Sequence, residues 1–436
     1  MEETKKRNSE RAWDAVYDMC HIFVDELKKV FRDEGAVLFF LVVPIFYPLL
    51  YSWIYTNEVV KDVPAVFVDD SHSFLSREFI RRCDACEGMK VVAVAANMEE
   101  AQRMQSEQLC HGIVHIPSDF ADRINRGEQT AVTFFADMSG MLYYKGILIS
   151  VTDVSLEMGR NIQVESLGKW TDHEEAIGSL PLKNKDIQLF NPQGGYGSFL
   201  LPGVLMLILQ QTLMLGIGLL AGTSREKNKS GELIPENMHY NGIFRYIWGK
   251  SLCYYAVYSV ISLWVLCAVP RIFSFIQLAD FASIVAIVIP YLCACIFFGI
   301  TFSCLMRYRE NVILLTVFTS VPFLFLSGIP WPESAISGAW KGISYLIPST
   351  FGINAYVKLN SLGASLEDVQ FEFRALWIQA LFYFITACFV YNNHIKRYEH
   401  QNEEYKELMD VKAEAESIYK SEHPELQDGN NTPQQS

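Results

Sequence analysis

Charge is scarce in this sequence, and basic charge is the scarcer of the two signs. Only 19% of the 436 residues are charged, with 36 Lys and Arg against 49 Asp and Glu, and the net charge is −13. A protein that binds a phosphate backbone needs a basic face, so this balance excludes a nucleic acid as a partner. A hydrophobic content of 50% with so little charge is typical of a membrane protein that also has a soluble part.

A cleavable signal peptide is lacking as well. Residues 1–16 include a basic stretch, but no short apolar core with a small-residue cleavage site follows them. We therefore expect the first apolar run to remain in the mature protein.

Motifs for catalysis, metal binding and nucleotide binding are also missing. Gly249-Lys250-Ser251 resembles the end of a phosphate-binding loop, but Phe244 stands where that motif requires its first Gly. Lys250 is interpreted instead as the start of an apolar span. His111 and His115 have the spacing of a metal pair, yet they flank a predicted strand in an otherwise ordinary segment. We expect no catalytic, cofactor-binding or metal-binding residue in this chain, and no enzyme activity of its own.

The ten cysteines do not have the pattern of a disulfide framework. Six lie in apolar runs, where Cys behaves as a small hydrophobic residue: Cys253, Cys267, Cys293, Cys295, Cys304 and Cys388. Cys83 and Cys86 have the CxxC spacing of redox or metal sites, although no second CxxC follows. If their segment faces an oxidising compartment, we expect instead a disulfide among Cys83, Cys86 and Cys110.

Long apolar runs are what the sequence has in abundance. Six of them contain no Asp, Glu, Lys or Arg and are close to the length that crosses ~30 Å of hydrocarbon: Gly35–Tyr55, Ser198–Ala221, Leu252–Val269, Phe281–Cys304, Val312–Leu326 and Ala375–Tyr391. Pro44 and Pro48 are expected to kink the first run. The predicted fold class is an α-helical polytopic membrane protein of six transmembrane helices, with an inserted α/β extracytoplasmic domain.

These runs divide the chain into five parts. We assign residues 1–34 to an N-terminal segment, 35–56 to transmembrane helix 1, 57–195 to the inserted domain, 196–394 to transmembrane helices 2 to 6, and 395–436 to a tail. The tail is charged and predicted to be helical from Arg397 to Lys420, and its last residues are polar enough to be disordered.

The segment before the first span predicts an amphipathic helix. Apolar residues recur at helical spacing from Trp13 to Phe31, with charged residues such as Asp18 and Glu26 between them. Next to a membrane span, such a helix is expected to lie in the plane of the interface. A soluble helix that packs on a core is the alternative.

The inserted segment alternates short apolar runs with helical patterns, which predicts an α/β unit. The expected strands are Pro64–Val68, Val91–Ala95, Gly112–Ile116 and Ala131–Phe135, and the expected helices include Met98–Gln108 and Ser118–Arg126. After Asp137 we expect an extended helix that forms a stalk, and then a polar loop over residues 165–185.

Basic residues on the short flanks predict the topology. Lys and Arg gather before span one, between spans two and three and between spans four and five, whereas the loop between spans three and four has only Arg271. The positive-inside rule then puts both termini in the cytoplasm and residues 57–195 outside, because long translocated domains escape the rule.

The segment between spans five and six, residues 327–370, is apolar in patches but interrupted by Pro330, Pro332 and Pro348. We predict one or two short re-entrant helices that enter the outer leaflet against protein or a wet cavity. A loop that packs on the inserted domain is the alternative.

Polar side chains within the spans are candidates for a translocation path: Gln210, Gln211, Tyr254, Tyr258, Thr316 and Ser320. Hydrogen bonding between helices explains them as well, and is the interpretation we favour. Ion-coupled transport is not indicated, because such carriers usually place ionisable residues inside their spans.

The order of these parts resembles the ABC-2 type transporter permeases that have a large extracytoplasmic domain between spans one and two. The resemblance covers nearly the whole chain. Its motifs are Gly112 to Phe120, Asn191-Pro192, Leu201-Pro202-Gly203, Arg225-Glu226, Gly231-Glu232, Leu326-Ser327-Gly328, Ile347-Pro348-Ser349-Thr350 and Leu362-Gly363-Ala364. Each piece is weak by itself, but the ordered set is specific.

The resemblance implies a permease subunit that dimerises with a second copy or a paralogue and pairs with two ABC ATPase subunits, which bind ATP and Mg²⁺. It implies export of a drug, lipid, glycan or peptide across a bacterial inner membrane. Membrane lipids, a periplasmic adaptor and an outer-membrane channel are the further candidate partners.

The resemblance also assigns roles to segments of this chain. The N-terminal helix is similar to the connecting helix of the family, and the cytoplasmic loop 222–251 is similar to its coupling segment, with Arg225, Glu226, Gly231 and Glu232 as the ATPase-coupling residues. Two alternatives remain: an envelope scaffold or receptor whose inserted domain binds an adaptor or ligand, and a membrane-embedded enzyme that acts on lipid-linked substrates.

Overall fold

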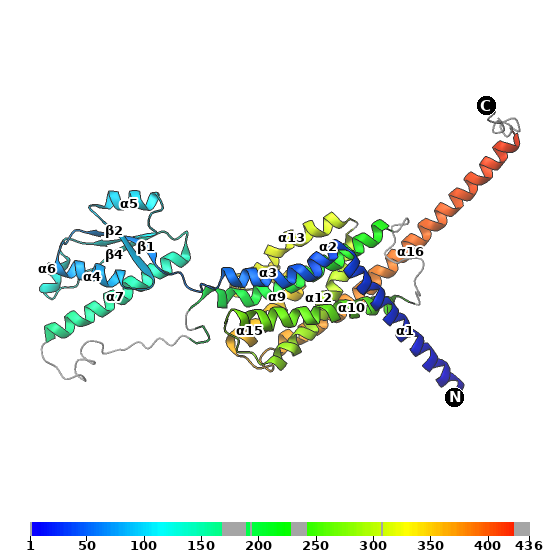
Figure 1. The fold of residues 1–436 in the computed structure, drawn as a ribbon, viewed down its shortest axis with the longest axis horizontal. Coiled ribbons are helices and arrows are strands. Elements are labelled where there is room, and N and C mark those ends of the chain that lie inside the picture. Colours follow the sequence, from blue (N-terminus) through cyan, green and yellow to red (C-terminus); the bar gives the residue numbers. More distant parts are fainter. Residues whose placement is uncertain (1, 168–188, 192–193, 228–241, 307, 423–436) are drawn as a thin grey trace, which may run out of the picture. The chain divides into compact units, whose positions relative to one another are not determined.

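The computed structural model describes residues 2–167, 189–191, 194–227, 242–306 and 308–422 (Figure 1). The chain forms two compact units. Unit 1 consists of Met1–Thr56 and Tyr196–Ser436, and unit 2 consists of Asn57–Gly195. Each unit has a hydrophobic core of its own.

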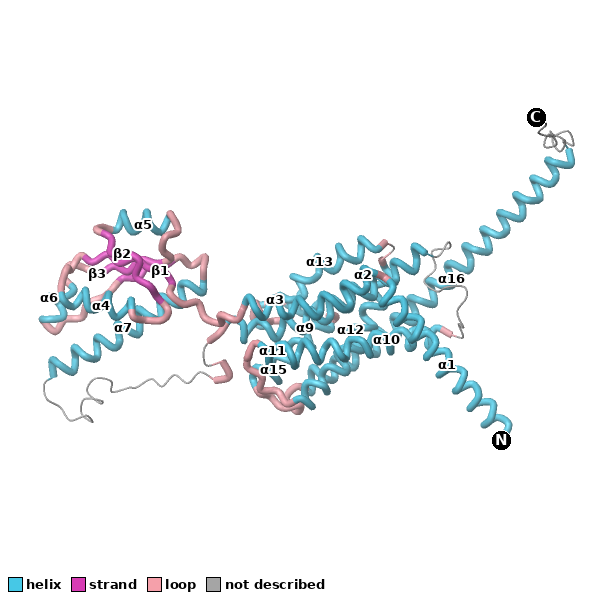
Figure 2. Tube along the Cα trace, in the orientation of Figure 1, coloured by secondary structure: helices cyan, strands magenta, loops and turns pink. Residues whose placement is uncertain are grey.

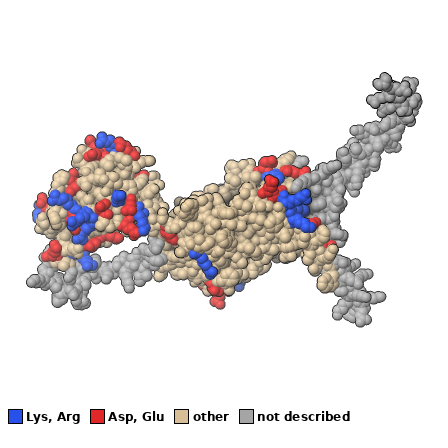
Figure 3. Space-filling model, in the orientation of Figure 1, with Lys and Arg blue, Asp and Glu red and all other residues tan. Residues whose placement is uncertain are grey.

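Unit 1 is a bundle of helices preceded by α1 (Glu2–Arg32). In the described part of the chain, six helical segments are long and apolar enough to cross a membrane, as predicted. They are α2–η1–α3 (Glu34–Val37, Leu38–Val42, Val43–Ile54), α9 (Tyr196–Lys227), α10–η2–α11 (Ile243–Leu263, Trp264–Ala268, Val269–Ile272), α12 (Phe281–Leu305), α13 (Arg309–Leu326) and the first part of α16 (Gln370–Glu422). On the face drawn in Figure 3, unit 1 has a broad band without charged side chains, as a lipid-facing surface requires.

Two of the spans contain a π-helical turn directly before a proline. Leu38–Val42 precedes α3, which has Pro44 in its first turn, and Trp264–Ala268 precedes α11, which has Pro270 in its first turn. Proline cannot donate a backbone hydrogen bond, and its ring clashes with the preceding turn. A wider π turn accommodates that clash. The π turns were not predicted, and the kinks at Pro44 and Pro48 stay predictions.

Helix α9 lies at the centre of the bundle. Of its membrane-spanning window, 89% is buried, against 11% for α13. Glycines allow the close contacts: a Cβ at Gly216 would overlap the ring of Phe40, and one at Gly218 would overlap Val312. These two positions bring α9 against the first and fifth spans.

The segment between α13 and α16 forms η3 (Glu333–Ala335), α14 (Gly338–Ser344) and α15 (Pro348–Leu362). Helix α15 begins with Pro348 in its first turn and ends at Gly363, which has the left-handed conformation (φ 60°) that favours glycine. Its buried side chains join the core of unit 1, together with residues of α9 and α12. The segment is therefore helical and packs on unit 1, and its re-entry into the outer leaflet stays a prediction.

Several predicted boundaries of unit 1 lie inside helices. Helix α9 continues to Lys227 and α10 begins at Ile243, so the predicted loop 222–251 is helical at both ends. Helix α16 runs without a break through the predicted junction between span six and the tail. The polar end of the tail, 423–436, is outside the described residues. Apolar composition marks only the part of a helix that is in lipid, and helical hydrogen bonding continues beyond it.

Unit 2 is built on a four-stranded sheet (Figure 2). The strands are β1 (Val63–Asp69), β2 (Met89–Ala95), β3 (Gly112–Ile116) and β4 (Thr133–Ala136), close to the predicted ranges. Their order is β2-β1-β3-β4; β1 is parallel to β2 and β3, and β4 is antiparallel to β3.

Helices cover both faces of this sheet. Helices α4 (Phe74–Asp84), α6 (Phe120–Asn125) and α7 (Met141–Leu167) share a core with residues such as Phe67 and Ile116 on one face. Helix α5 (Met98–Ser106) covers Val66 and Ile113 on the other. The chain moves from β1 to β2 in one direction and from β2 to β3 in the opposite direction, so right-handed crossovers put α4 and α5 on opposite faces.

Helix α7 differs from its prediction. It is long, but it is not a free stalk between Ile147 and Met158, because Ile147, Val151, Val154 and Met158 are buried in the core of unit 2. Their spacing of four, three and four residues makes one helical stripe. Most of the predicted loop 165–185 is outside the described residues.

Candidate functional site

Helix α1 has a buried face and an exposed apolar face. Asp18, Ile22, Glu26 and Val30 recur every fourth residue and are all buried. The exposed apolar residues fall at helical spacing on another side of the helix: Trp13, Tyr17, Val24 and Phe31. The second stripe fits the predicted position in a membrane interface. The first stripe was not predicted, and it attaches α1 to the bundle.

Three acidic residues make this attachment: two bind basic residues of α10, and the third binds a basic residue of α13. Asp18 pairs with Arg245 of α10 at 3.0 Å, Glu26 pairs with Lys250 of α10 at 3.2 Å, and Asp33 pairs with Arg309 of α13 at 3.0 Å. All three carboxylates are buried. Because they are eight and seven residues apart, they fall on one side of the chain about two helical turns from one another.

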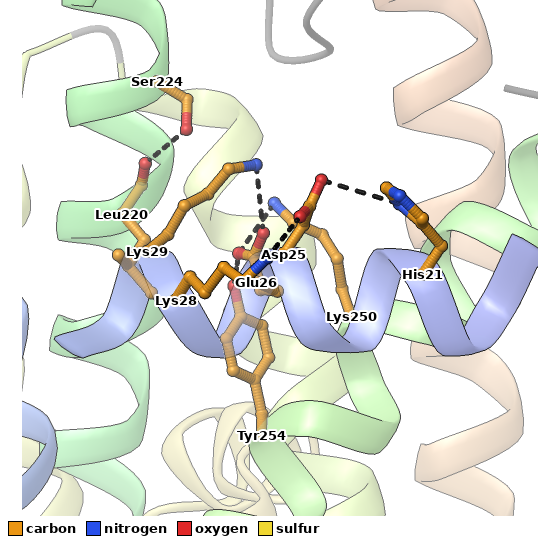
Figure 4. A network of polar contacts seen from close by, with 9 residues as sticks. All are labelled: His21, Asp25, Glu26, Lys28, Lys29, Leu220, Ser224, Lys250 and Tyr254. Carbon is orange, nitrogen blue, oxygen red and sulfur yellow. Dashed lines mark hydrogen bonds and ion pairs between the residues drawn. The ribbon is translucent and has the colours of Figure 1, made fainter. Parts of the chain in front are cut away.

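Glu26 and Lys250 are the most enclosed of these pairs; their side chains are 1% and 5% exposed (Figure 4). The hydroxyl of Tyr254 donates to the same carboxylate, and Lys29 is 3.4 Å from its other oxygen. Burial alone raises the pKa of Glu26, but Lys250, Lys29 and Tyr254 together hold it below its ordinary value of 4.5. We call Glu26, Lys29, Lys250 and Tyr254 the Glu26 cluster.

The outer side of α1 has weaker pairs of the same chemistry. Asp25 lies 3.7 Å from His21 and 3.8 Å from Lys28, with the Lys28 side chain 73% exposed (Figure 4). Ion pairs in water contribute little stability, so these residues solvate the helix and do not attach it to the bundle.

Gly249 of α10 allows α1 to come close enough for the buried pairs. A Cβ at this position would lie 2.9 Å from Ile22 and 3.1 Å from the backbone oxygen of Met19.

Asp33 connects three further elements. One oxygen caps α2 by accepting from the amide of Ala36 at 3.0 Å, and the same oxygen accepts from Arg309. The other accepts from the hydroxyl of Thr223, on α9, at 2.7 Å. The junction of α1 and the first span is therefore tied to α9 and α13.

Arg225, predicted to contact an ATPase, is buried and used inside the protein. Its guanidinium donates to the carbonyls of Cys304, at 3.0 Å, and Met306, and it lies 3.4 Å from the ring nitrogen of His394. These carbonyls end α12, and a helix end attracts a cation. The Arg225 side chain therefore contacts the end of α12 within this chain, and its coupling to an ATPase stays a prediction. Glu226, the next residue, is exposed, and Gly231 and Glu232 are outside the described residues.

Four of the candidate translocation residues have hydrogen-bond partners within the described part of the chain. Tyr254 belongs to the Glu26 cluster, Tyr258 donates to Thr212 of α9 at 3.0 Å, and both rings pack against Phe40. The hydroxyls of Thr316 and Ser320 donate to carbonyls of their own helix. Interhelical bonding, the favoured alternative, accounts for Tyr258.

Gln210 and Gln211 differ from the other candidates. Both are buried, and the thiol of Cys295 donates to the Gln210 oxygen at 3.7 Å. Within the described part of the chain, both amide nitrogens and the Gln211 oxygen have no hydrogen-bond partner. Buried amides normally find partners, so these two remain the best candidates for polar contacts with groups outside this chain.

The predicted disulfide is not formed in the structure. Cys83, Cys86 and Cys110 are free thiols, and Cys83 and Cys110 pack in the cores on opposite faces of the sheet. Cys86 donates to the carbonyl of Arg82. Burial, with a smaller contribution from Cys86, raises the pKa of Cys83 to about 12, so this thiol is a poor nucleophile.

The two histidines considered for metal binding have other contacts. His115 is 2.8 Å from a carboxylate oxygen of Asp70, and His111 stacks on the ring of Tyr143. Among the residues that the structure describes, no group of three or more His, Cys, Asp or Glu could hold a metal ion.

The acidic residues of α1 are not predicted to be buried, because charge within an amphipathic pattern normally marks a solvent-facing side. A signal was present: Asp18, Glu26 and Asp33 share one helical face with Ile22 and Val30. Lys250 was likewise interpreted as a flanking residue, whereas it lies two turns inside α10.

Comparison with known proteins gives one family. Residues 36–389 match the model of a family described as ABC-2 family transporter protein. The match starts in the first span and ends in the last. A search of curated proteins finds no matching sequence.

Proposed function

Because the chain belongs to the ABC-2 family of transporter proteins, we propose that it is the membrane subunit of an exporter driven by ATP that a separate ATPase subunit hydrolyses. In this proposal the end of the bundle that carries α1 and Glu226 faces the cytoplasm and contacts the ATPase. Unit 2 faces the opposite side of the membrane.

One observation carries the proposal: buried polar contacts connect α1, α9, α10, α12 and α13 at a single end of the bundle. The Glu26 cluster joins α1 to α10, Asp33 joins the start of the first span to α9 and α13, and Arg225 joins α9 to α12. A partner that pushes on α1 or on the end of α9 would therefore move several spans together. Transport driven from outside the chain needs such a transmission.

Charged residues within the spans would be expected of a self-powered carrier. Lys250 is enclosed by its partners, which leaves it no free role in ion coupling. The proposal thus requires a second protein that supplies energy.

The test is to purify the full chain from native membranes, identify any ATPase that accompanies it, and measure ATP hydrolysis in reconstituted bilayers. Glu226→Lys reverses an exposed charge next to Arg225 and should weaken ATPase association by about fivefold. Glu367→Lys makes the same charge reversal at an exposed residue just before α16. In the proposed topology this residue lies on the side of the membrane opposite Glu226, so the change should have no effect. A wild-type chain that brings no ATPase contradicts the proposal, and equal association in both variants contradicts the role of Glu226.

The proposed topology has its own test. In a variant without the exposed Cys20 and the partly exposed Cys86, a membrane-impermeant thiol reagent should label Met138→Cys from outside and Glu226→Cys only after the membrane is opened. Both positions are exposed. The reverse labelling pattern would invert the topology.

A further inference from the structure

Unit 2 contains a cavity of about 660 Å³, which is within the ordinary size range of ligand pockets. It is bounded by α6, by the segment that follows α6, and by the second half of α7. Its apolar lining consists mainly of Phe79, Phe120, Ile124, Val132, Met158 and Ile162. Most of these side chains also belong to the core on that face of the sheet, so the cavity opens directly onto a hydrophobic interior.

The cavity is elongated along α7. The α7 residues that line it run from Ser155 to Gln163, which is a distance of about 12 Å at 1.5 Å per residue. Leu156 lies on this side and is 65% exposed. A long apolar groove with an exposed leucine fits a flexible chain better than a compact ligand.

Two charged residues lie at the cavity, and only one of them is paired. Glu128 forms an ion pair with Arg126 at 3.2 Å. Arg160 lines the same cavity and has no ion-pair partner among the residues that the structure describes. A guanidinium binds a carboxylate with matched geometry. One guanidinium offsets one negative charge, so a singly charged carboxylate fits the cavity better than a doubly charged phosphate.

Two glycines keep the groove open. A Cβ added at Gly127 or at Gly159 would meet no atom within 4 Å. Gly127 has φ of +74°, which favours glycine for backbone reasons. Gly159 is not required by the backbone conformation, because it lies inside α7, where glycine costs roughly 1 kcal/mol relative to alanine. The absence of a side chain at this position leaves space in the groove beside α7.

We propose that this cavity binds a single acyl chain that ends in a carboxylate, with the chain along α7 and the carboxylate at Arg160. Binding of a fatty acid in unit 2 is distinct from the proposed ATP-driven transport. It can be measured without ATP and without a partner subunit.

The test uses the full chain in a lipid bilayer and palmitic acid that carries a photoreactive diazirine. After illumination, mass spectrometry locates the labelled peptides. Labelling should occur in residues 120–132 and 155–163, in addition to the membrane helices that any lipid probe reaches. The labelled membrane helices serve as the internal standard for delivery of the probe.

Position 159 provides a matched pair of variants. Gly159→Leu should fill the groove and reduce labelling of unit 2 at least fivefold, while Gly159→Ala should retain it. Both residues favour a helix over glycine, so neither change is expected to unfold α7. Arg160→Gln should weaken competition by unlabelled palmitate about fivefold, and leave competition by methyl palmitate unchanged.

Labelling confined to the membrane helices overturns the proposal, and so does equal labelling of unit 2 in Gly159→Leu and Gly159→Ala. Equal competition by palmitate and its methyl ester in the wild type overturns the role of Arg160. Circular dichroism of each variant confirms that a loss of labelling is not a loss of fold.

Discussion

The carboxylate of Glu26 on α1 lies 3.2 Å from the ammonium group of Lys250 on α10, and both side chains are almost completely removed from solvent. A hydroxyl from Tyr254 and a second ammonium group from Lys29 complete the surroundings of the carboxylate. Four polar groups therefore attach the N-terminal helix at a place where the sequence indicated only a solvent-facing side.

Replacing one partner of this ion pair should destabilise the protein more than replacing both partners with apolar residues. Glu26→Gln or Lys250→Met alone leaves one buried charge without its partner, at a cost of about 3–5 kcal/mol. The double variant Glu26→Leu with Lys250→Met should recover most of that loss, because two apolar groups need no partner. The measurement is the free energy of unfolding in detergent, and Lys28→Met is the control because its pair with Asp25 is exposed. A double variant as unstable as the sum of the two single variants would contradict this account.

The stability provided by Glu26 should depend on pH in one direction. Its pKa in the folded protein is below the ordinary value of 4.5, so the folded state favours the ionised form. The contribution is complete above pH 4.5 and is lost as the pH falls through the folded-state pKa. The melting temperature of the wild type should therefore exceed that of Glu26→Gln at pH 7 and approach it below pH 4.5. A gap that widens on acidification would reverse the sign and refute the assignment.

Substitution of Arg225 should lower the stability of the protein, whereas substitution of the neighbouring Glu226 should not. Arg225→Lys keeps the charge but loses the planar group that reaches two carbonyls of α12, and should cost about 1.5–3 kcal/mol. Glu226→Gln changes an exposed side chain and should stay within about 0.5 kcal/mol of the wild type. Thermal unfolding of the two variants gives the comparison. If Glu226→Gln destabilises the protein more than Arg225→Lys does, the structural role assigned to Arg225 is contradicted.

The cysteines of unit 2 should react in an order set by burial. Cys86 is partly exposed, whereas Cys83 and Cys110 are buried and the pKa of Cys83 is raised to about 12. At pH 8 a maleimide should modify Cys86 first and reach Cys83 and Cys110 only after denaturation. Peptide mass spectrometry of a time course tests the order. A disulfide among the three, detected without reductant, would restore the original prediction from the sequence.

Hydrophobic pattern and length were sufficient to predict much of the fold. The six spans follow from the length of uncharged apolar runs, the four strands of unit 2 from short apolar runs, and α1 from a helical period. The two π turns and the continuous α16 could not be predicted from the sequence, because hydrogen bonding within a helix extends past the residues that show a pattern.

The candidate site was harder to predict because its residues pair across elements that are far apart in sequence. Glu26 looks like a surface residue until Lys250 is seen beside it, and Arg225 looks like a surface residue until the end of α12 is known. Local pattern identifies an ionisable residue, but only the packing of α1, α9 and α12 decides whether it meets water or a partner.

The bond between Arg225 and the end of α12 makes those two helices difficult to separate. Parting them would remove the hydrogen bonds between two carbonyls and the buried guanidinium, at a cost of about 1.5–3 kcal/mol. Hinge motion within this pair is therefore disfavoured, and α9 and α12 behave as one stiff body. Any rearrangement that opens the bundle must occur at its loosely packed members, and α13, the least buried span, is the piece that can move without breaking this bond.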